Sequence, residues 1–164
     1  MEIEIDVEHW PHGHWLALAE RAAGAAAIVE PALANARLAV SILLTNDAEV
    51  HALNREWRNR DKATNVLSFP MLSRDDLLAL DPDGAPELLG DIALAHETCV
   101  GEAAEKGVAL TDHVAHLIVH ALLHLAGHDH VDSEEQAEAM EALEIKALAQ
   151  MGIANPYEAF DASR

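Results

Sequence analysis

A group of histidines near the middle of this 164-residue chain has the spacing of a metal site. His120 and His124 lie four positions apart in an apolar stretch. A helix would therefore place both imidazoles on one face, about one turn apart. Gly127 can adopt the left-handed conformation that ends a helix, and His130 follows where the chain can turn back toward the first two. The pattern H-x-x-x-H-x-x-G-x-x-H predicts one metal ion bound by His120, His124 and His130.

The expected ion is zinc. Zn²⁺ prefers about four ligands, and a hydrolytic site keeps one position for water, which three imidazoles allow. Imidazoles also suit nickel, copper and iron, so the residues leave Ni²⁺ or another divalent metal open. His116 shares a stripe with His120 but lacks the glycine turn and a third ligand, and His128 is a competing ligand beside the predicted loop. A single histidine is more often a core or surface residue, whereas the combined spacing favours a metal site.

The residue after the first histidine limits the chemistry. Zinc proteases of the metzincin type share this spacing and carry Glu at that position as the general base. This chain has Ala121 there, which can neither accept nor donate a proton. Hydrolysis of a peptide or another substrate by that mechanism is therefore the weakest of the functional hypotheses for this site.

A second group of charged residues lies just before a short strand. Arg55, Arg58, Arg60 and Lys62, four of the ten basic residues, fall within eight positions. Val66–Pro70 (VLSFP) follows as a strand stopped by proline. A basic loop is usually only solvated, but a guanidinium with fork-like donors is suited to holding a phosphate.

Together the two motifs resemble the YbeY family of endoribonucleases that mature rRNA. That family carries R-x-x-D-K-x-T-x-V-L-S-F-P, matched here from Arg58 to Pro70, and H-G-x-L-H-L-x-G-Y-D-H, matched from His120 to His130. Ala121 stands for the family's Gly and His128 for its Tyr. The resemblance also includes an LGDI segment and extends from about residue 37 to residue 157.

The resemblance implies a metal-dependent endoribonuclease that cuts single-stranded RNA, with a role in rRNA 3′-end maturation and ribosome quality control. It implies that His120, His124 and His130 hold Zn²⁺ and that Arg58 is the functional arginine, which would position a phosphate and stabilise developing negative charge. Lys62 is a candidate for a second phosphate contact. The implied partners are rRNA and the small ribosomal subunit, with a small-subunit ribosomal protein and an Era-type GTPase as further candidates, and neither a membrane nor DNA.

The charge of the chain supports an alternative. With 29 acidic and 10 basic residues the net charge is −19, whereas nucleic-acid binders usually show a basic patch. A local basic site in an acidic shell can still hold a few phosphates. The alternative is a non-catalytic ribosome-assembly factor with a structural metal, which would have four protein ligands rather than three and a water.

Composition and the chain's start indicate the compartment. The single Cys99 fits a reducing environment, and the acidic, alternating segment at residues 1–10 is unlike a signal peptide. No apolar run reaches the roughly 18–20 residues that a membrane span needs. We expect a cytoplasmic protein.

The predicted elements that position these residues form one domain over residues 1–164. The expected fold class is α+β, with a small mixed sheet of about four strands packed by helices and the metal-binding helix at the centre. We expect strands at residues 2–8, 37–44, 66–70 and 88–94. Gly90 in the last of these is expected to permit a close backbone approach, and Asp91 to have a structural role.

The expected helices have identifiable signals. An alanine-rich helical region is expected to break at Gly24 and at Pro31. A helix over residues 47–57 begins at an N-cap among residues 45–47 and buries Val50, Leu53 and Trp57. Further helices are expected over residues 96–106, from a cap at Thr111, and over residues 133–151. In the last of these, Ser133 and Gln136 resemble a capping box, and the glutamates would form a solvated face.

Overall fold

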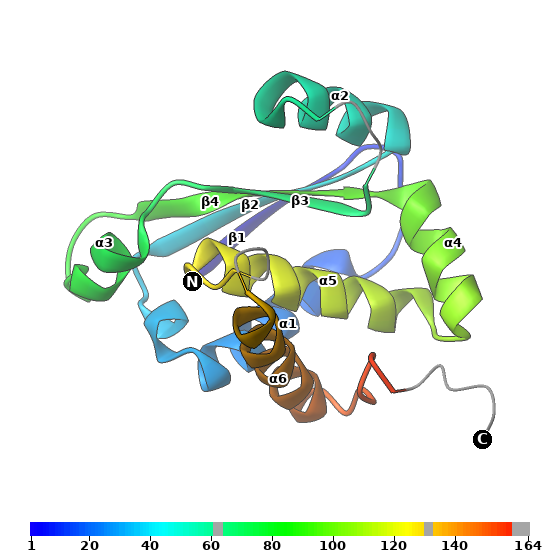
Figure 1. Ribbon diagram of the computed structural model, residues 1–164. Helices are drawn as coiled ribbons and strands as arrows, with labels where there is room; N and C mark the ends of the chain where they lie inside the picture. Colours follow the sequence, from blue (N-terminus) through cyan, green and yellow to red (C-terminus); the bar gives the residue numbers. More distant parts are fainter. Residues whose placement is uncertain (61–63, 130–132, 159–164) are drawn as a thin grey trace.

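The computed structural model describes residues 1–60, 64–129 and 133–158, and it has the predicted α+β architecture (Figure 1). One mixed sheet has the strand order β1-β2-β4-β3. The strands are β1 (Glu2–Val7), β2 (Leu38–Thr45), β3 (Val66–Pro70) and β4 (Glu87–Ala95). The helices are α1 (Trp15–Val29), the 3₁₀ helix η1 (Pro31–Ala34), α2 (Asp47–Arg58), α3 (Arg74–Ala79), α4 (His96–Lys106), α5 (Leu110–Leu125) and α6 (Glu134–Gln150).

The sheet combines parallel and antiparallel pairing. β1 and β4 both run parallel to β2, while β3 runs antiparallel to β4 at the edge of the sheet. The apolar run that predicted an interior strand is β2, whose Ile42 pairs with Ile5 on one side and with Ile92 on the other. Successive residues of β3 face opposite sides of the sheet, so Ser68 and Phe69 point in opposite directions.

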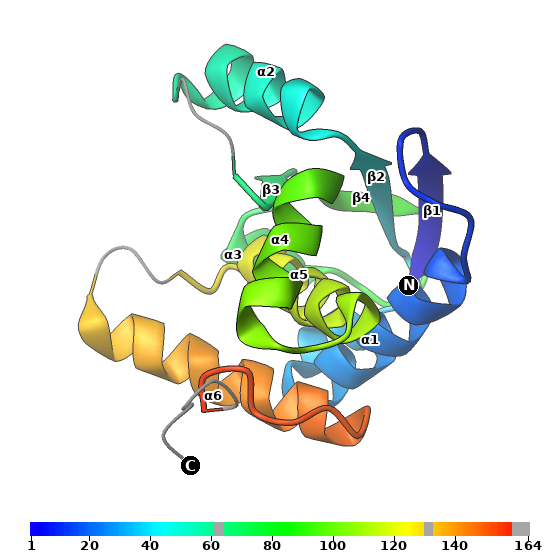
Figure 2. The ribbon, with the colours of Figure 1, turned by 90° about the vertical axis from the view of Figure 1, so that its right-hand side faces the viewer.

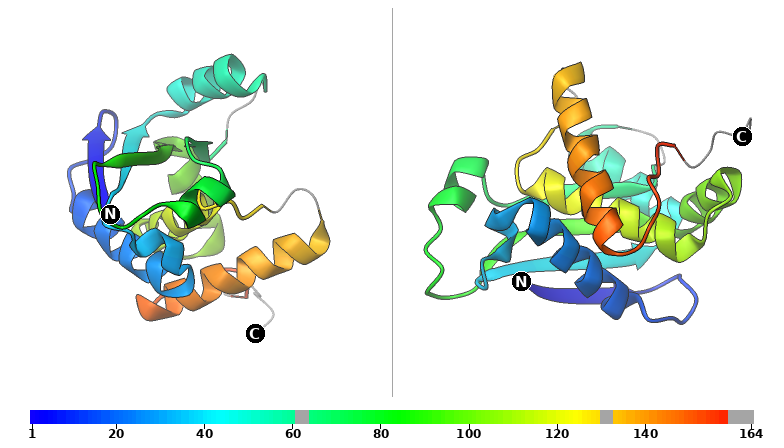
Figure 3. Two further views of the ribbon diagram at one scale, coloured as in Figure 1. Left: turned by 90° about the vertical axis from the view of Figure 1, so that its left-hand side faces the viewer. Right: turned by 90° about the horizontal axis from the view of Figure 1, so that it is seen from below.

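Helix α5 lies at the centre of the fold, between the sheet and a layer formed by α1 and α6 (Figures 1 and 3). Val114, Ile118 and Leu122 of this helix are at most 1% exposed, as the apolar residues on nearly all its sides predicted. Helix α4 meets α5 at a sharp bend (Figure 2). None of the described helices is long and apolar enough to cross a membrane by itself, and α4 with α5 meets that criterion only as a pair bent by 113°.

The predicted break at Gly24 is wrong. Helix α1 continues through Gly24 to Val29, and Pro31 begins η1. A glycine costs a helix only about 1 kcal/mol, and the neighbouring alanines are the strongest helix formers. The buried alanines of α1, which include Ala19, Ala22 and Ala26, also pack it into the core.

Trp57 was predicted to lie in the core, but it is 69% exposed. Helix α2 is the only described helix on its face of the sheet (Figure 1), so no second layer buries its outer side. Val50 is fully buried, in a small cluster beneath α2. The aromatic residues of the core are instead Trp10 and Trp15, whose rings meet edge to face at 5.1 Å.

Helix caps agree with the predictions at two of three positions. Asn46 caps α2 by accepting from the backbone N–H of Glu49, and Ser133 caps α6 by accepting from that of Gln136. The predicted cap at Thr111 is wrong, because α5 begins at Leu110 and Thr111 lies within its first turn.

Candidate active site

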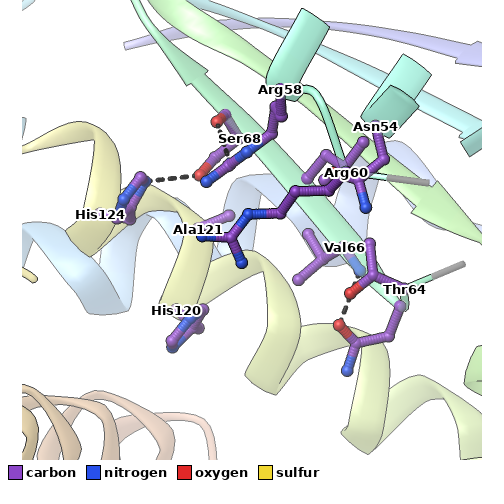
Figure 4. A pocket seen from close by; sticks show the side chains of 11 residues that line it. Asn54, Arg58, Arg60, Thr64, Val66, Ser68, His120, Ala121 and His124 are labelled. Carbon is purple, nitrogen blue, oxygen red and sulfur yellow. Dashed lines mark hydrogen bonds between the residues drawn. The ribbon is translucent and has the colours of Figure 1, made fainter. Parts of the chain in front are cut away.

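His120 and His124 project from one side of α5 into a cavity of about 240 Å³ (Figure 4). The facing wall comes from the end of α2, the start of β3 and the loop between them. The structure thus brings both histidines together with the predicted arginine, Arg58. The described lining residues are Asn54, Arg58, Arg60, Thr64, Asn65, Val66, Leu67, Ser68, His120, Ala121 and His124.

The ring of His124 is held by the sheet. Its Nδ1 lies 2.6 Å from the Oγ of Ser68, which β3 directs toward α5. A hydroxyl can accept a hydrogen bond as well as donate one, so Ser68 can accept from an Nδ1–H group. His124 would then present Nε2 as the ligand atom. Sequence reasoning assigned Ser68 no role, although its place in the VLSFP strand puts it on the inner face.

The ring of His120 is held by a neighbouring helix. Its Nδ1 lies 2.9 Å from Oε2 of Glu144, which belongs to α6 and is 1% exposed. The same carboxylate bonds to His116 Nε2 at 2.6 Å and to the hydroxyl of Tyr157 at 2.5 Å. Burial raises the pKa of Glu144, but hydrogen bonds from His116 and His120 outweigh it and lower the pKa to about 2.

The glutamates of the last helix were predicted to form a solvated face, which is wrong for Glu144. A signal for its burial exists in the sequence. Met140, Glu144, Ala147 and Leu148 recur at helical spacing, and all four are buried. A carboxylate on an apolar stripe requires a buried donor, and the many histidines of α5 supply one.

Arg58 and Arg60 both direct their side chains into the cavity (Figure 4). Nη1 of Arg58 donates to the backbone carbonyl of Ser68 at 3.4 Å. Asn59 ends α2 in the left-handed conformation, with φ at 54°, and this reverses the chain so that Arg60 also reaches the cavity. The side chain of Arg60 extends toward the cavity wall that carries Ala121 and the two histidines (Figure 4).

Two predicted site residues, His130 and Lys62, lie outside the described residues. Their predicted roles as the third metal ligand and as a phosphate contact therefore stay predictions.

The competing histidines have other partners. Nε2 of His128 lies 2.7 Å from Oε1 of Glu30, the residue that follows α1. Arg74 donates through Nη1 to the same Glu30 oxygen and to the backbone carbonyl of Ala126 at 2.8 Å. His116 is buried against Glu144 and does not line the cavity.

This second carboxylate joins three helices. Glu30 follows α1, Arg74 begins α3, and Ala126 follows α5. Burial raises the pKa of Glu30, but the hydrogen bonds from His128 and Arg74 outweigh it, so the pKa lies below its ordinary value. The turn after α5, which leads toward His130, is therefore held by charged contacts.

A separate hollow of about 510 Å³ lies on the other face of the sheet, beneath α2. Trp57, Phe69 and Met71 contribute apolar surface, and Asp91 lies among its acidic residues. Asp91 therefore does not line the histidine cavity. The neighbouring Gly90 has the predicted close contact, because a Cβ there would lie 2.5 Å from the carbonyl oxygen of Phe69.

The donor set of the cavity fits a divalent transition metal. Imidazole ligands usually donate a hydrogen bond from their second ring nitrogen to a carboxylate, a carbonyl or a water molecule, and this bond fixes the orientation of the ring. His120 has such a carboxylate in Glu144, and His124 has the hydroxyl of Ser68.

Comparison with known proteins adds an independent finding. A family model described as "Endoribonuclease YbeY" matches residues 4–152 of the chain. The "Endoribonuclease YbeY" of Erythrobacter litoralis (strain HTCC2594) is 67% identical over 157 residues, covering 96% of this chain and 98% of that protein. The protein of the same name from Novosphingobium aromaticivorans is 56% identical over 162 residues, covering 98% and 97%. The solution structure of TM1509 from Thermotoga maritima shares the fold, with a TM-score of 0.57 and 22% identity over 99% of both chains.

Proposed function

This chain belongs to the endoribonuclease YbeY family, and we propose that it cleaves single-stranded RNA with one bound Zn²⁺ ion during rRNA 3′-end maturation and ribosome quality control. The supporting observation is that two arginines and two histidines with fixed rings face one cavity. We propose further that residues 1–164 act as a single catalytic domain in the cytoplasm, on rRNA of the small ribosomal subunit.

The proposed ligands are His120, His124 and His130. When bound, the ion supplies Lewis acidity toward a phosphodiester and makes water easier to deprotonate. Glu144 and Ser68 hold the rings of His120 and His124, so these ligands are oriented before the metal arrives. A preoriented site loses less entropy on binding than one whose side chains must be ordered.

The arginines provide the contact to RNA. The contact from Arg58 to the carbonyl of Ser68 uses one N–H group of its guanidinium, which has further N–H groups to offer a phosphate oxygen. Such a group stabilises the negative charge that develops during phosphoryl transfer. Arg60, which lines the same cavity as the two histidines, supplies a second positive charge, and Lys62 is proposed as a further phosphate contact.

The same cavity disfavours a peptide substrate. No carboxylate occurs among its described lining residues, so a general base of the protease kind is absent from this part of the site. The positive charges suit an anionic substrate instead. We set aside the non-catalytic assembly factor because the family to which the chain belongs is one of enzymes.

The test compares His124→Ala and Arg58→Ala with the wild type for bound metal and for cleavage of a defined single-stranded RNA. We expect His124→Ala to lose both metal and cleavage. We expect Arg58→Ala to keep the metal and to cleave about 10²–10³-fold more slowly.

The matched controls replace exposed residues of the same type, His12→Ala and Arg21→Ala. Both should retain metal and activity. Normal cleavage by metal-free His124→Ala, or unchanged turnover in Arg58→Ala, would overturn the proposed mechanism.

A further inference from the structure

A buried carboxylate lies directly behind the proposed metal site. Glu144 comes from α6, does not line the cavity, and is 1% exposed. Removing an ionised carboxylate from water is costly unless it is paired and hydrogen-bonded. The proposed cleavage chemistry does not use this residue, so its burial calls for another explanation.

The two oxygens of Glu144 have different partners. Oε1 receives the hydroxyl of Tyr157 at 2.5 Å and lies 2.6 Å from Nε2 of His116. Oε2 lies 2.9 Å from Nδ1 of His120. Two groups thus hold the first oxygen, and this leaves the second oxygen positioned to accept a hydrogen bond from His120.

The partner chemistry determines the form of His120. An ionised carboxylate only accepts hydrogen bonds, so Nδ1 of His120 must carry the proton that it shares with Oε2. In the neutral ring, Nε2 then holds the lone pair that a metal requires. The contrast with His124 is informative, because the Ser68 hydroxyl can donate or accept and does not select a tautomer.

We propose that Glu144 is the positioning residue of the metal site, locking His120 in the Nδ1–H tautomer with Nε2 toward the cavity. Tyr157 and His116 support this role by holding the carboxylate. The inference rests on the proposed function, since it assumes that His120 binds the ion. It also gives the segment after α6 a part in the site, although the side chain of Tyr157 never reaches the cavity.

Glu144→Gln tests the proposal because it keeps the shape of the side chain and removes its charge. The expected result is a 10–100-fold weaker Zn²⁺ affinity, the usual effect of losing such a partner. Affinity is measured by competition with a chromogenic chelator. Long-range ¹H–¹⁵N NMR of the metal-free protein reports the tautomer of His120, which should change from purely Nδ1–H to a mixture.

Tyr157→Phe removes one donor to Oε1 and leaves the carboxylate in place. We expect a smaller loss of Zn²⁺ affinity, of a few fold, in the same direction. Glu138→Gln makes the same charge change at an exposed position of α6 and should alter neither the affinity nor the tautomer. If Glu144→Gln does not fold, Tyr157→Phe decides the question by the same two measurements.

The outcomes separate this inference from the proposed function. Wild-type protein that binds no Zn²⁺ would overturn both. Wild-type protein that binds Zn²⁺, with equal affinity and an unchanged tautomer in Glu144→Gln, would overturn the positioning role alone. A loss of thermal stability without either change would assign Glu144 a purely structural role and would also overturn it.

Discussion

Individual residues of α5 meet two demands at once. His120 and His124 bond through Nδ1 to Glu144 and Ser68, which lie on different elements, while both residues line the same cavity. A ring held in this way keeps its direction when no ligand is present. This arrangement explains why the polar groups lie on an otherwise apolar helix.

Gly90 of β4 sets how closely this strand approaches β3 and α5. At Gly90, a Cβ atom would lie 2.5 Å from the carbonyl oxygen of Phe69 and 2.7 Å from Cδ2 of Leu125. The first neighbour is backbone and cannot move without shifting β3, whereas the second is the end of a side chain that is 1% exposed and has little room to turn aside. We predict that Gly90→Ala lowers the free energy of unfolding by about 1–3 kcal/mol, measured by urea denaturation.

The matched control is Gly24→Ala in α1. A Cβ there meets nothing within 4 Å, and alanine is the better helix former. This variant should gain up to about 1 kcal/mol. Equal stability of Gly90→Ala and wild type would show that the sheet and α5 can separate without cost.

Among the secondary-structure elements, the most predictable are those with strong local signals. β3 and α4 have the predicted bounds, because proline ends the first and Gly107 ends the second. Local signals failed where packing decides the outcome. Helix α1 continues through Gly24 because of its alanines. Trp57 has the helical spacing of a core residue, but no layer packs against it.

The candidate site could be predicted only in part for the same reason. His120, His124 and Arg58 belong to motifs with fixed spacing, so the sequence identifies them. The contact of His120 with Glu144 joins residues 24 positions apart on two helices, and only their packing reveals it. Ser68 was similarly hidden, because its role depends on which face of β3 meets α5.

The contact of Glu30 with Arg74 and His128 gives a prediction about stability. Glu30 is 6% exposed, and replacing it with Gln removes the charge that both partners require. We predict that Glu30→Gln lowers the free energy of unfolding at pH 7 by about 1–3 kcal/mol. Urea denaturation measures the difference, and Glu20→Gln on the exposed side of α1 is the control.

The pH dependence of the stability difference between wild type and Glu30→Gln follows from the direction in which the pKa of Glu30 is shifted. The pKa of Glu30 is lower in the folded protein than its ordinary value of 4.5. Its contribution is therefore complete above pH 4.5 and is lost as the pH falls through the folded-state pKa. The gap between wild type and Glu30→Gln should narrow in acid. A gap that stays constant from pH 7 to acid would contradict the charged pairing.

Across the whole molecule, charge is divided unevenly. The chain carries a net charge of −19, yet its described cavity residues include two arginines and no carboxylate. The overall field repels RNA, while the cavity attracts a few phosphates at short range. We therefore expect weak affinity that depends on local contacts rather than on a broad basic surface.

The salt dependence of RNA binding tests this picture. For single strands, each neutralised phosphate contributes about −0.7 to the slope of log K against log salt concentration. Arg60→Ala should make that slope shallower by about 0.7, measured by fluorescence anisotropy with metal-free protein, which should not cleave. Arg21→Ala makes the same change in net charge at an exposed position away from the cavity, so it should leave the slope unchanged. The same slope for Arg60→Ala and wild type would remove Arg60 from the RNA contacts.

The overall arrangement was less predictable than its parts. The sequence predicted a mixed sheet of about four strands around a central helix, and both are present. It did not predict that α2 lies on the opposite face of the sheet from α5. Arg58 lines the same cavity as the histidines because α2 ends beside the edge strand β3, and strand order is set by pairing between distant segments.

The last turn of α2 has a practical consequence. Trp57 and Arg58 are neighbours that line hollows on opposite faces of the sheet. Trp10 and Trp15 are each 7% exposed, so among the chain's three tryptophans Trp57 alone has an indole in broad contact with solvent. The protein therefore carries one solvent-exposed intrinsic fluorophore, which lies next in sequence to its proposed phosphate-binding arginine.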